Sequence, residues 1–87
     1  MYLHLGNDVT VNMNNVIGIF DMDNTTVSPA TRKFLKKAEK NGRIIDITDD
    51  LPKSFVVARA WDGEVVYISS LASRTLLKRV KSGKIII

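Results

Sequence analysis

Residues 54–69 read Ser-Phe-Val-Val-Ala-Arg-Ala-Trp-Asp-Gly-Glu-Val-Val-Tyr-Ile-Ser. The segments 54–61 and 64–69 are rich in β-branched and aromatic residues, a composition that favours strands. Asp62-Gly63 between them is a two-residue hairpin signal and predicts a type I′ turn. Since a tight turn joins antiparallel strands, we expect a small antiparallel or mixed sheet built around this pair.

Short strands are also predicted on both sides of the hairpin. The strand at residues 2–5 precedes the turn signal Gly6-Asn7-Asp8, and apolar and polar residues alternate over 9–13. Asn14-Asn15 can turn the chain. The apolar run Val16–Phe20 predicts a strand buried on both faces, in which Gly18 allows close packing or a bulge. Residues 43–48 predict another strand, followed by a loop over 49–52.

A helix is predicted between Ser28-Pro29 and Asn41-Gly42. Serine suits the N-cap, where its side chain accepts a backbone N–H, and proline suits the first helical position. Glycine supplies the left-handed conformation that ends many helices. The apolar stripe of this helix consists of Ala30, Phe34, Leu35 and Ala38.

A second helix is predicted from Ser70 or Ser73 to about Lys81, where Ser82-Gly83 stops it. Its apolar side consists of Leu76, Leu77 and Val80. The apolar end Lys84–Ile87 allows a late strand, a contact with a neighbouring subunit or a frayed tail.

The predicted order of elements is therefore β-β-β-α-β-β-β-α, an α+β fold in which two helices pack on the sheet. With 87 residues, we expect residues 1–87 to form a single domain. A domain this small has a marginal core, so oligomerisation would help it.

Composition narrows the class of protein. The chain has no cysteine, which excludes disulfides and thiolate metal sites and fits a reducing cytosol, so we expect a cytoplasmic protein. The N-terminus lacks the basic and long apolar regions of a signal peptide. No run of about 18 apolar residues occurs, so no membrane span is expected.

The charges are strongly segregated along the chain. Residues 1–30 contain three acids and no Lys or Arg, residues 31–43 contain six bases and one acid, and residues 74–84 contain five bases and no acid. This segregation, with a net charge of +4, indicates an anionic partner, with double-stranded DNA the first candidate. The alternative interpretation is that these basic segments are helix faces that contact only water. Both interpretations, an anionic partner and a solvated surface, stay open.

Loop-tip residues sharpen the prediction of a nucleic-acid site. Lys53 follows Pro52 at the start of a strand, and Asn15 lies between two early strands. Both types commonly contact phosphate, although they also occur in turns for local reasons. Trp61 and Tyr67 are expected to pack on the sheet rather than stack on bases. The predicted nucleic-acid-binding residues are Lys53, Asn15, Lys33, Lys36, Lys37 and Arg43.

One motif suggests catalysis. Ile19-Phe20-Asp21-Met22-Asp23-Asn24-Thr25 resembles the first motif of haloacid-dehalogenase phosphatases, whose first Asp is the nucleophile. That chemistry needs a longer, doubly wound parallel sheet. The single histidine, His4, has no partner motif. We therefore expect no enzyme, and no catalytic, cofactor-binding or metal-binding residues.

The ordered pattern resembles the RemA/RemB family of bacterial extracellular-matrix regulators and is closer to its RemB branch. The matching segments are 2–6, 15–20, Ser28-Pro29, Asn41-Gly42, 45–48, 52–57, 69–71, Thr75-Leu76 and Lys78-Arg79.

This resemblance implies a ring-forming, DNA-associated transcriptional regulator of biofilm genes. The RemA branch contacts DNA through an Arg that falls on Asn15 here and an Arg pair that falls near Leu51-Pro52, beside Lys53. Because these arginines are absent, a protein-interaction module without DNA contact is the alternative function.

Overall fold

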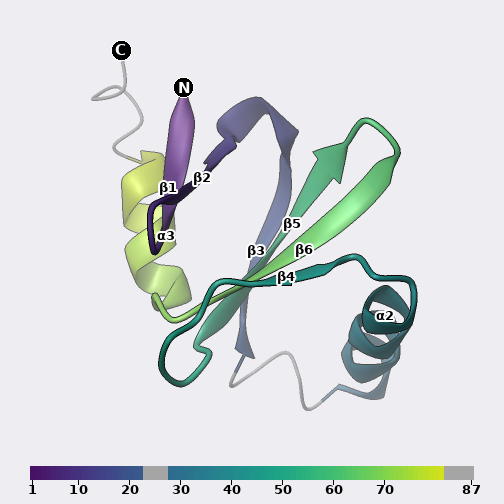
Figure 1. Cartoon of the computed structure of the whole chain (residues 1–87). Coiled ribbons are helices and arrows are strands. Elements are labelled where there is room, and N and C mark those ends of the chain that lie inside the picture. The colour runs from purple at the N-terminus through teal and green to yellow at the C-terminus, as the bar shows by residue number, and fades with distance from the viewer. Residues whose placement is uncertain (23–27, 82–87) are drawn as a thin grey trace.

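A four-stranded sheet, in the order β3-β5-β6-β4, forms the centre of the molecule in the computed structural model, which describes residues 1–22 and 28–81. A separate β1-β2 hairpin and α3 lie at one side of this sheet and α2 at the other (Figure 1). Strand β4 runs parallel to β6 and the other pairs are antiparallel, so the sheet is mixed. The predicted α+β class and element order are confirmed. The elements are β1 (Tyr2–Gly6), β2 (Val9–Asn12), the 3₁₀ helix η1 (Met13–Asn15), β3 (Val16–Asp21), α2 (Pro29–Lys40), β4 (Ile44–Asp46), β5 (Ser54–Ala60), β6 (Gly63–Ser69) and α3 (Ser73–Lys81).

The β5-β6 hairpin forms as predicted, but its turn lies one residue earlier. Ala60 pairs with Gly63, so Trp61 and Asp62 are the loop residues. Neither has a positive φ, which excludes a type I′ turn, and Gly63 follows them at a φ of 134°. The positive φ values of a type I′ turn occur instead at Asn7 and Asp8, 50° and 61°, between β1 and β2.

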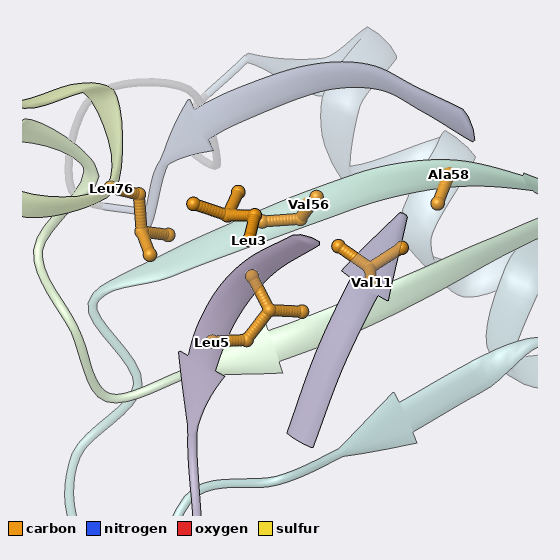
Figure 2. Packing of buried hydrophobic residues seen from close by; sticks show 6 residues of the cluster. All are labelled: Leu3, Leu5, Val11, Val56, Ala58 and Leu76. Carbon is orange, nitrogen blue, oxygen red and sulfur yellow. The ribbon is translucent and has the colours of Figure 1, made fainter. Parts of the chain in front are cut away.

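Two apolar clusters cover opposite faces of the sheet because the side chains of β5 alternate between them. Figure 2 shows the first cluster, where Val56 and Ala58 meet side chains from β1, β2 and α3. In the second cluster, Phe55 and Val57 meet Ala38 of α2. A central strand with partners on both sides is buried on both faces, and this holds for β5.

The prediction that Val16–Phe20 is buried on both faces is wrong. Within residues 1–22 and 28–81, strand β3 pairs only with β5 and so lies at the edge of the sheet, and Ile17 and Phe20 are 48% and 37% exposed. The register shifts between Val16 and Gly18, which confirms a bulge. The Phe20 ring also covers Gly18, where a Cβ would lie 2.6 Å from it, and stacks on Phe55 at 5.0 Å between ring centroids.

The predicted boundaries of α2 are confirmed. Its first helical residue is Pro29, although the Ser28 side chain makes no capping hydrogen bond. At the other end Gly42 has a φ of 69°. Its N–H donates to the Glu39 carbonyl at 3.1 Å, and the N–H of Arg43 donates to the Ala38 carbonyl at 2.8 Å. These two bonds form a Schellman motif.

Helix α3 starts at Ser73, one of the two predicted positions. Leu76 is fully buried, whereas Leu77 is 44% exposed and does not join the core. The predicted helix end at Ser82-Gly83 and the apolar end Lys84–Ile87 lie outside the described residues. None of the helices in the described part of the chain is long and apolar enough to cross a membrane.

Candidate functional site

Lys53 has a fixed backbone and an exposed side chain. Its N–H donates to the Ser69 carbonyl at 2.9 Å, and its carbonyl accepts from the N–H of Met22 at 3.1 Å. The first bond links Lys53 to the end of β6, and the second links it to the residue after β3. The ammonium group is therefore presented to solvent from a well-anchored point at the end of the sheet where β5 begins.

A polar cavity of about 420 Å³ lies beside Lys53. Its other walls come from Asp21 and from the beginning of α3, including Ser73 and the exposed Arg74. The first N–H groups of a helix carry partial positive charge, which adds to the two cationic side chains. This combination of positive charges suits an anionic group such as phosphate, whereas the negative charge of Asp21 opposes it.

Two serines with no exposed surface hold this corner together. Ser54 and Ser69 are cross-strand partners at the ends of β5 and β6. The Ser69 hydroxyl donates to the Leu5 carbonyl at 2.8 Å and accepts from the N–H of Leu71 at 3.0 Å. The Ser54 hydroxyl donates to the Leu71 carbonyl at 2.7 Å. The connection that leads to α3, and hence Arg74, is thereby fixed relative to Lys53.

Arg74 was not among the predicted site residues. It lies far from Lys53 in the sequence, and only the fold brings the two to one cavity. The segment 74–84, which contains five bases and no acid, is the sequence signal that could have indicated it.

Asn15 does not join this site. It is exposed on η1, immediately before β3. Val16 pairs with Ala58, whereas Asp21, at the other end of β3, pairs with Ser54 next to Lys53. At about 3.3 Å per residue, the length of β3 separates Asn15 from Lys53 by roughly 17 Å.

Lys33, Lys36 and Lys37 are exposed on α2, whose buried residue Ala38 faces the sheet. The helical period places Lys33 and Lys36 on the side opposite Ala38. Lys37 belongs to the last turn, where a cation interacts favourably with the helix dipole. These lysines form a basic surface of their own, in a layer different from that of Lys53.

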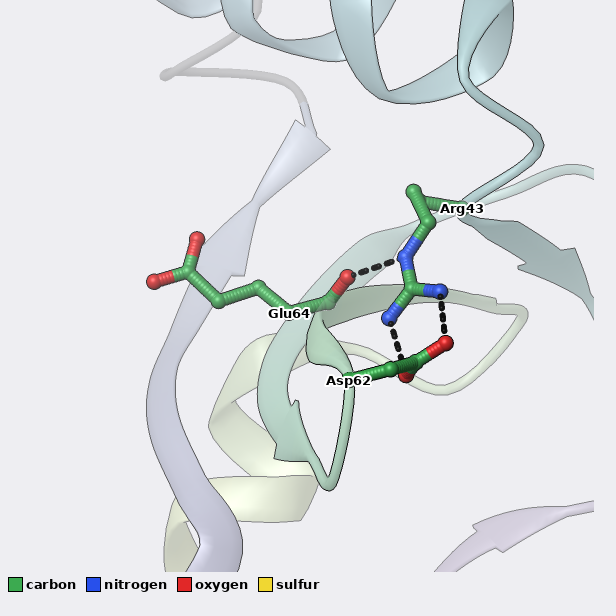
Figure 3. Close-up of polar contacts among 3 residues, drawn as sticks. All are labelled: Arg43, Asp62 and Glu64. Atoms are coloured by element: carbon green, nitrogen blue, oxygen red, sulfur yellow. Dashed lines mark hydrogen bonds and ion pairs between the residues drawn. The ribbon is translucent and has the colours of Figure 1, made fainter.

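Arg43 forms a clamp on the β5-β6 hairpin, here called the Arg43 clamp (Figure 3). Its Nε–H donates to the Glu64 carbonyl at 2.7 Å, and its terminal nitrogens donate to the two Asp62 carboxylate oxygens at 3.1 and 3.0 Å. The hydrogen bonds from Arg43 lower the pKa of Asp62, and the same bonds raise the pKa of Arg43. Arg43 therefore has a structural role, and only its remaining N–H groups could meet a phosphate.

No group of three His, Asp or Glu side chains within residues 1–22 and 28–81 is arranged to hold a metal ion. Asp21 lies at the end of β3, but Asp23, Asn24 and Thr25 of the phosphatase-like motif lie outside the described residues. His4 is exposed on β1.

Comparison with known proteins assigns the fold to a family. The model of the RemA-like family, described as extracellular matrix regulatory protein A-like, matches residues 2–80. The chain belongs to the RemA-like family. Within this family, it is 37% identical over 81 residues to extracellular matrix regulatory protein B of Bacillus subtilis (strain 168), an alignment that covers 93% of this chain and 91% of that protein. The resemblance to the RemB branch is confirmed, and the RemA-like match includes both Lys53 and Arg74.

Proposed function

We propose that this chain is a non-enzymatic regulator of extracellular-matrix and biofilm gene expression that acts in the cytoplasm as a DNA-associated homo-oligomer. Membership of the RemA-like family and similarity to extracellular matrix regulatory protein B support the regulatory role. The cavity where Lys53 and Arg74 meet the first turn of α3 supports contact with DNA.

Each subunit would contribute a small number of phosphate contacts. Lys53 and Arg74 replace, in this proposal, the arginines that the resemblance places at Asn15 and near Leu51-Pro52. Contacts of this kind are individually weak, but a closed oligomer presents several copies of them to one duplex. The α2 surface, with Lys33, Lys36 and Lys37, would add contacts where the duplex passes that layer. Arg43 would contribute least because the Arg43 clamp uses three of its N–H donors.

A fluorescence anisotropy titration with a labelled duplex tests this function. Wild type is expected to bind at low salt and to weaken steeply as salt rises. Lys53→Ala and Arg74→Ala are each expected to weaken binding and to reduce the slope of log K against log salt by about one for each copy that contacts the duplex. Arg59→Ala, which removes an exposed base outside both the cavity and α2, is the matched control and should change binding less. Absence of wild-type binding at low salt would overturn the DNA contact.

A second function is favoured by the exposed apolar residues. Ile17, Phe34 and Trp61 are 48%, 38% and 99% exposed, a property typical of surfaces that bind protein. A protein-interaction module in the same regulatory system would use such residues without touching DNA. Co-purification with a partner that survives nuclease treatment, combined with no duplex binding by the pure chain, would support this alternative.

A further inference from the structure

Asn41-Gly42 joins α2 to β4, and both residues are exposed to water. Asparagine is one of the chemically least stable side chains in proteins, because the backbone nitrogen of the next residue can attack its amide carbon. A side chain on that next residue hinders the attack, and glycine has none. Among the asparagines of the chain, only Asn41 is followed by glycine. This pair is therefore the place where the sequence favours deamidation most.

Deamidation at such a pair needs water and no other reactant. The Gly42 nitrogen, once its proton is lost, forms a bond to Cγ of Asn41. The bond from Cγ to Nδ2 then breaks, and ammonia leaves with a proton. Water opens the resulting imide ring by breaking one of its two bonds to nitrogen. Breaking the bond from Cγ gives aspartate, and breaking the bond from the main-chain carbonyl carbon gives isoaspartate, whose backbone runs through Cβ.

The folded geometry of Asn41 opposes the closure of this ring. Its ψ of 6° places the Gly42 nitrogen almost in line with the Asn41 nitrogen. Because nitrogen and Cβ occupy different corners of the tetrahedral Cα, the Gly42 nitrogen is turned away from the side chain that it must attack. Its N–H also donates to the Glu39 carbonyl at 3.1 Å. The attacking atom is thus both misplaced and already bonded within the Schellman motif.

The Arg43 clamp fixes the segment that follows Gly42. The backbone N–H of Arg43 donates to the Ala38 carbonyl at 2.8 Å, and its side chain holds Asp62 and the carbonyl of Glu64 (Figure 3). Rotation about the Cα–C bond of Asn41 would carry Arg43 away from these partners. The reactive conformation therefore requires the end of α2 to open locally, as helix ends do when they fray.

We propose that Asn41 is a deamidation site that the fold keeps unreactive until the end of α2 frays. This inference does not depend on the proposed function. Asn41 lines a cavity of about 270 Å³ together with Lys37, Arg43 and Glu64. A new carboxylate there adds to that of Glu64 and offsets the two bases. Isoaspartate also lengthens the backbone between the hydrogen bonds of the Schellman motif, so it disrupts the end of α2 as well.

Peptide mass mapping of the full chain tests the proposal, with samples kept at mildly alkaline pH in buffer and in urea. In urea, Asn41 is expected to gain the mass of deamidation before any other asparagine. In buffer, the reaction should be slower by roughly 30-fold or more, the factor that corresponds to the loss of two ordinary hydrogen bonds. Asn41→Gln is the control and should stay unmodified at this position, because glutamine must close a larger ring.

Variants of the clamp test how the fold protects the site. Arg43→Ala should react several-fold faster than wild type in buffer and at the same rate in urea, and Asp62→Ala serves if that variant does not fold. Lys33→Ala, which removes an exposed base of the same helix outside the clamp, should react like wild type. Rates that do not change in the clamp variants would contradict the part that Arg43 plays.

Two results would overturn the proposal itself. These are equal rates for wild type in buffer and in urea, and earlier reaction at another asparagine in urea. The isoaspartate product, once isolated, should unfold at a lower urea concentration than Asn41→Asp, which has the same charge and a normal backbone. Equal midpoints would contradict the disruption of the end of α2.

Discussion

We expect the loss of the Ser69 side chain to destabilise the part of the fold that supports Lys53. Its hydroxyl is fully buried and joins β1 to the segment before α3 through the carbonyl of Leu5 and the N–H of Leu71. Ser69→Ala leaves both groups without this partner, so we expect the free energy of unfolding to fall by about 1–3 kcal/mol. Urea denaturation measures this change.

The adjacent Ser70 provides the control. Its hydroxyl oxygen is also inaccessible to solvent, yet it makes no hydrogen bond to any described residue. Ser70→Ala removes a polar atom that has no partner to lose, so its effect should be near zero or stabilising. Equal destabilisation by the two variants would show that the hydrogen bonds of Ser69 are not what matters.

Gly18 is required by one side chain on its own strand. A Cβ at this position would lie 2.6 Å from the Phe20 ring, which would have to leave its stacked position on Phe55. We expect Gly18→Ala to cost about 1–3 kcal/mol, the usual range for overpacking. Thermal or urea denaturation of a double-mutant cycle checks the cause, because Phe20→Ala should remove most of the cost. Additive effects would contradict it.

At the scale of elements, the Arg43 clamp ties the end of α2 to the β5-β6 hairpin. It lowers the pKa of Asp62 below the ordinary value of about 3.9, so the ionised form is favoured in the folded state. This contribution to stability is present above the pKa of the unfolded chain, and it is lost as pH falls through the lower pKa of the folded state. Wild type should therefore lose stability below about pH 4.

Asp62→Asn should show a shallower loss over the same acidic range because its side chain does not titrate. Urea denaturation at a series of pH values measures the difference. Asp49→Asn, at an exposed loop position, is the matched control and should follow the wild-type profile. Parallel profiles for wild type and Asp62→Asn would contradict the role of the ion pair.

Elements with local signals were predictable from the sequence, whereas the exposure of β3 was not. Pro29 and Gly42 set the ends of α2 through backbone preferences that act within a few residues. The apolar run of β3 does not reveal that, among the described strands, β5 alone pairs with it, so the exposure of β3 was not predicted. The turn of the β5-β6 hairpin lies one residue before the predicted position. The prediction placed Gly63 inside the turn, but glycine also suits the position after a turn, which Gly63 occupies.

At the scale of the whole molecule, the candidate site depends on contacts between distant segments. The bond from the Lys53 N–H to the Ser69 carbonyl places Lys53 near the start of α3, and hence near Arg74. Local sequence patterns do not show that Lys53 lies near Arg74. The segregation of charge therefore predicted basic surfaces, but not which basic residues lie close together. For the same reason, the sequence did not predict that the length of β3 separates Asn15 from Lys53.

Self-association should also appear in the stability of the molecule. A folded chain that binds its own copies is stabilised by mass action, so the melting temperature of wild type should rise with protein concentration. Differential scanning fluorimetry with an external dye measures this temperature over a dilution series. A wild-type melting temperature that is independent of concentration would contradict assembly.

The two apolar clusters on opposite faces of the sheet have a consequence for how such a protein can diverge. Substitutions that are well separated and share no partners act nearly independently. The side that carries α2 can therefore change its sequence with little effect on the side that carries α3, and the reverse also holds. A lineage with this architecture can gain or lose cations on one side while selection preserves the other.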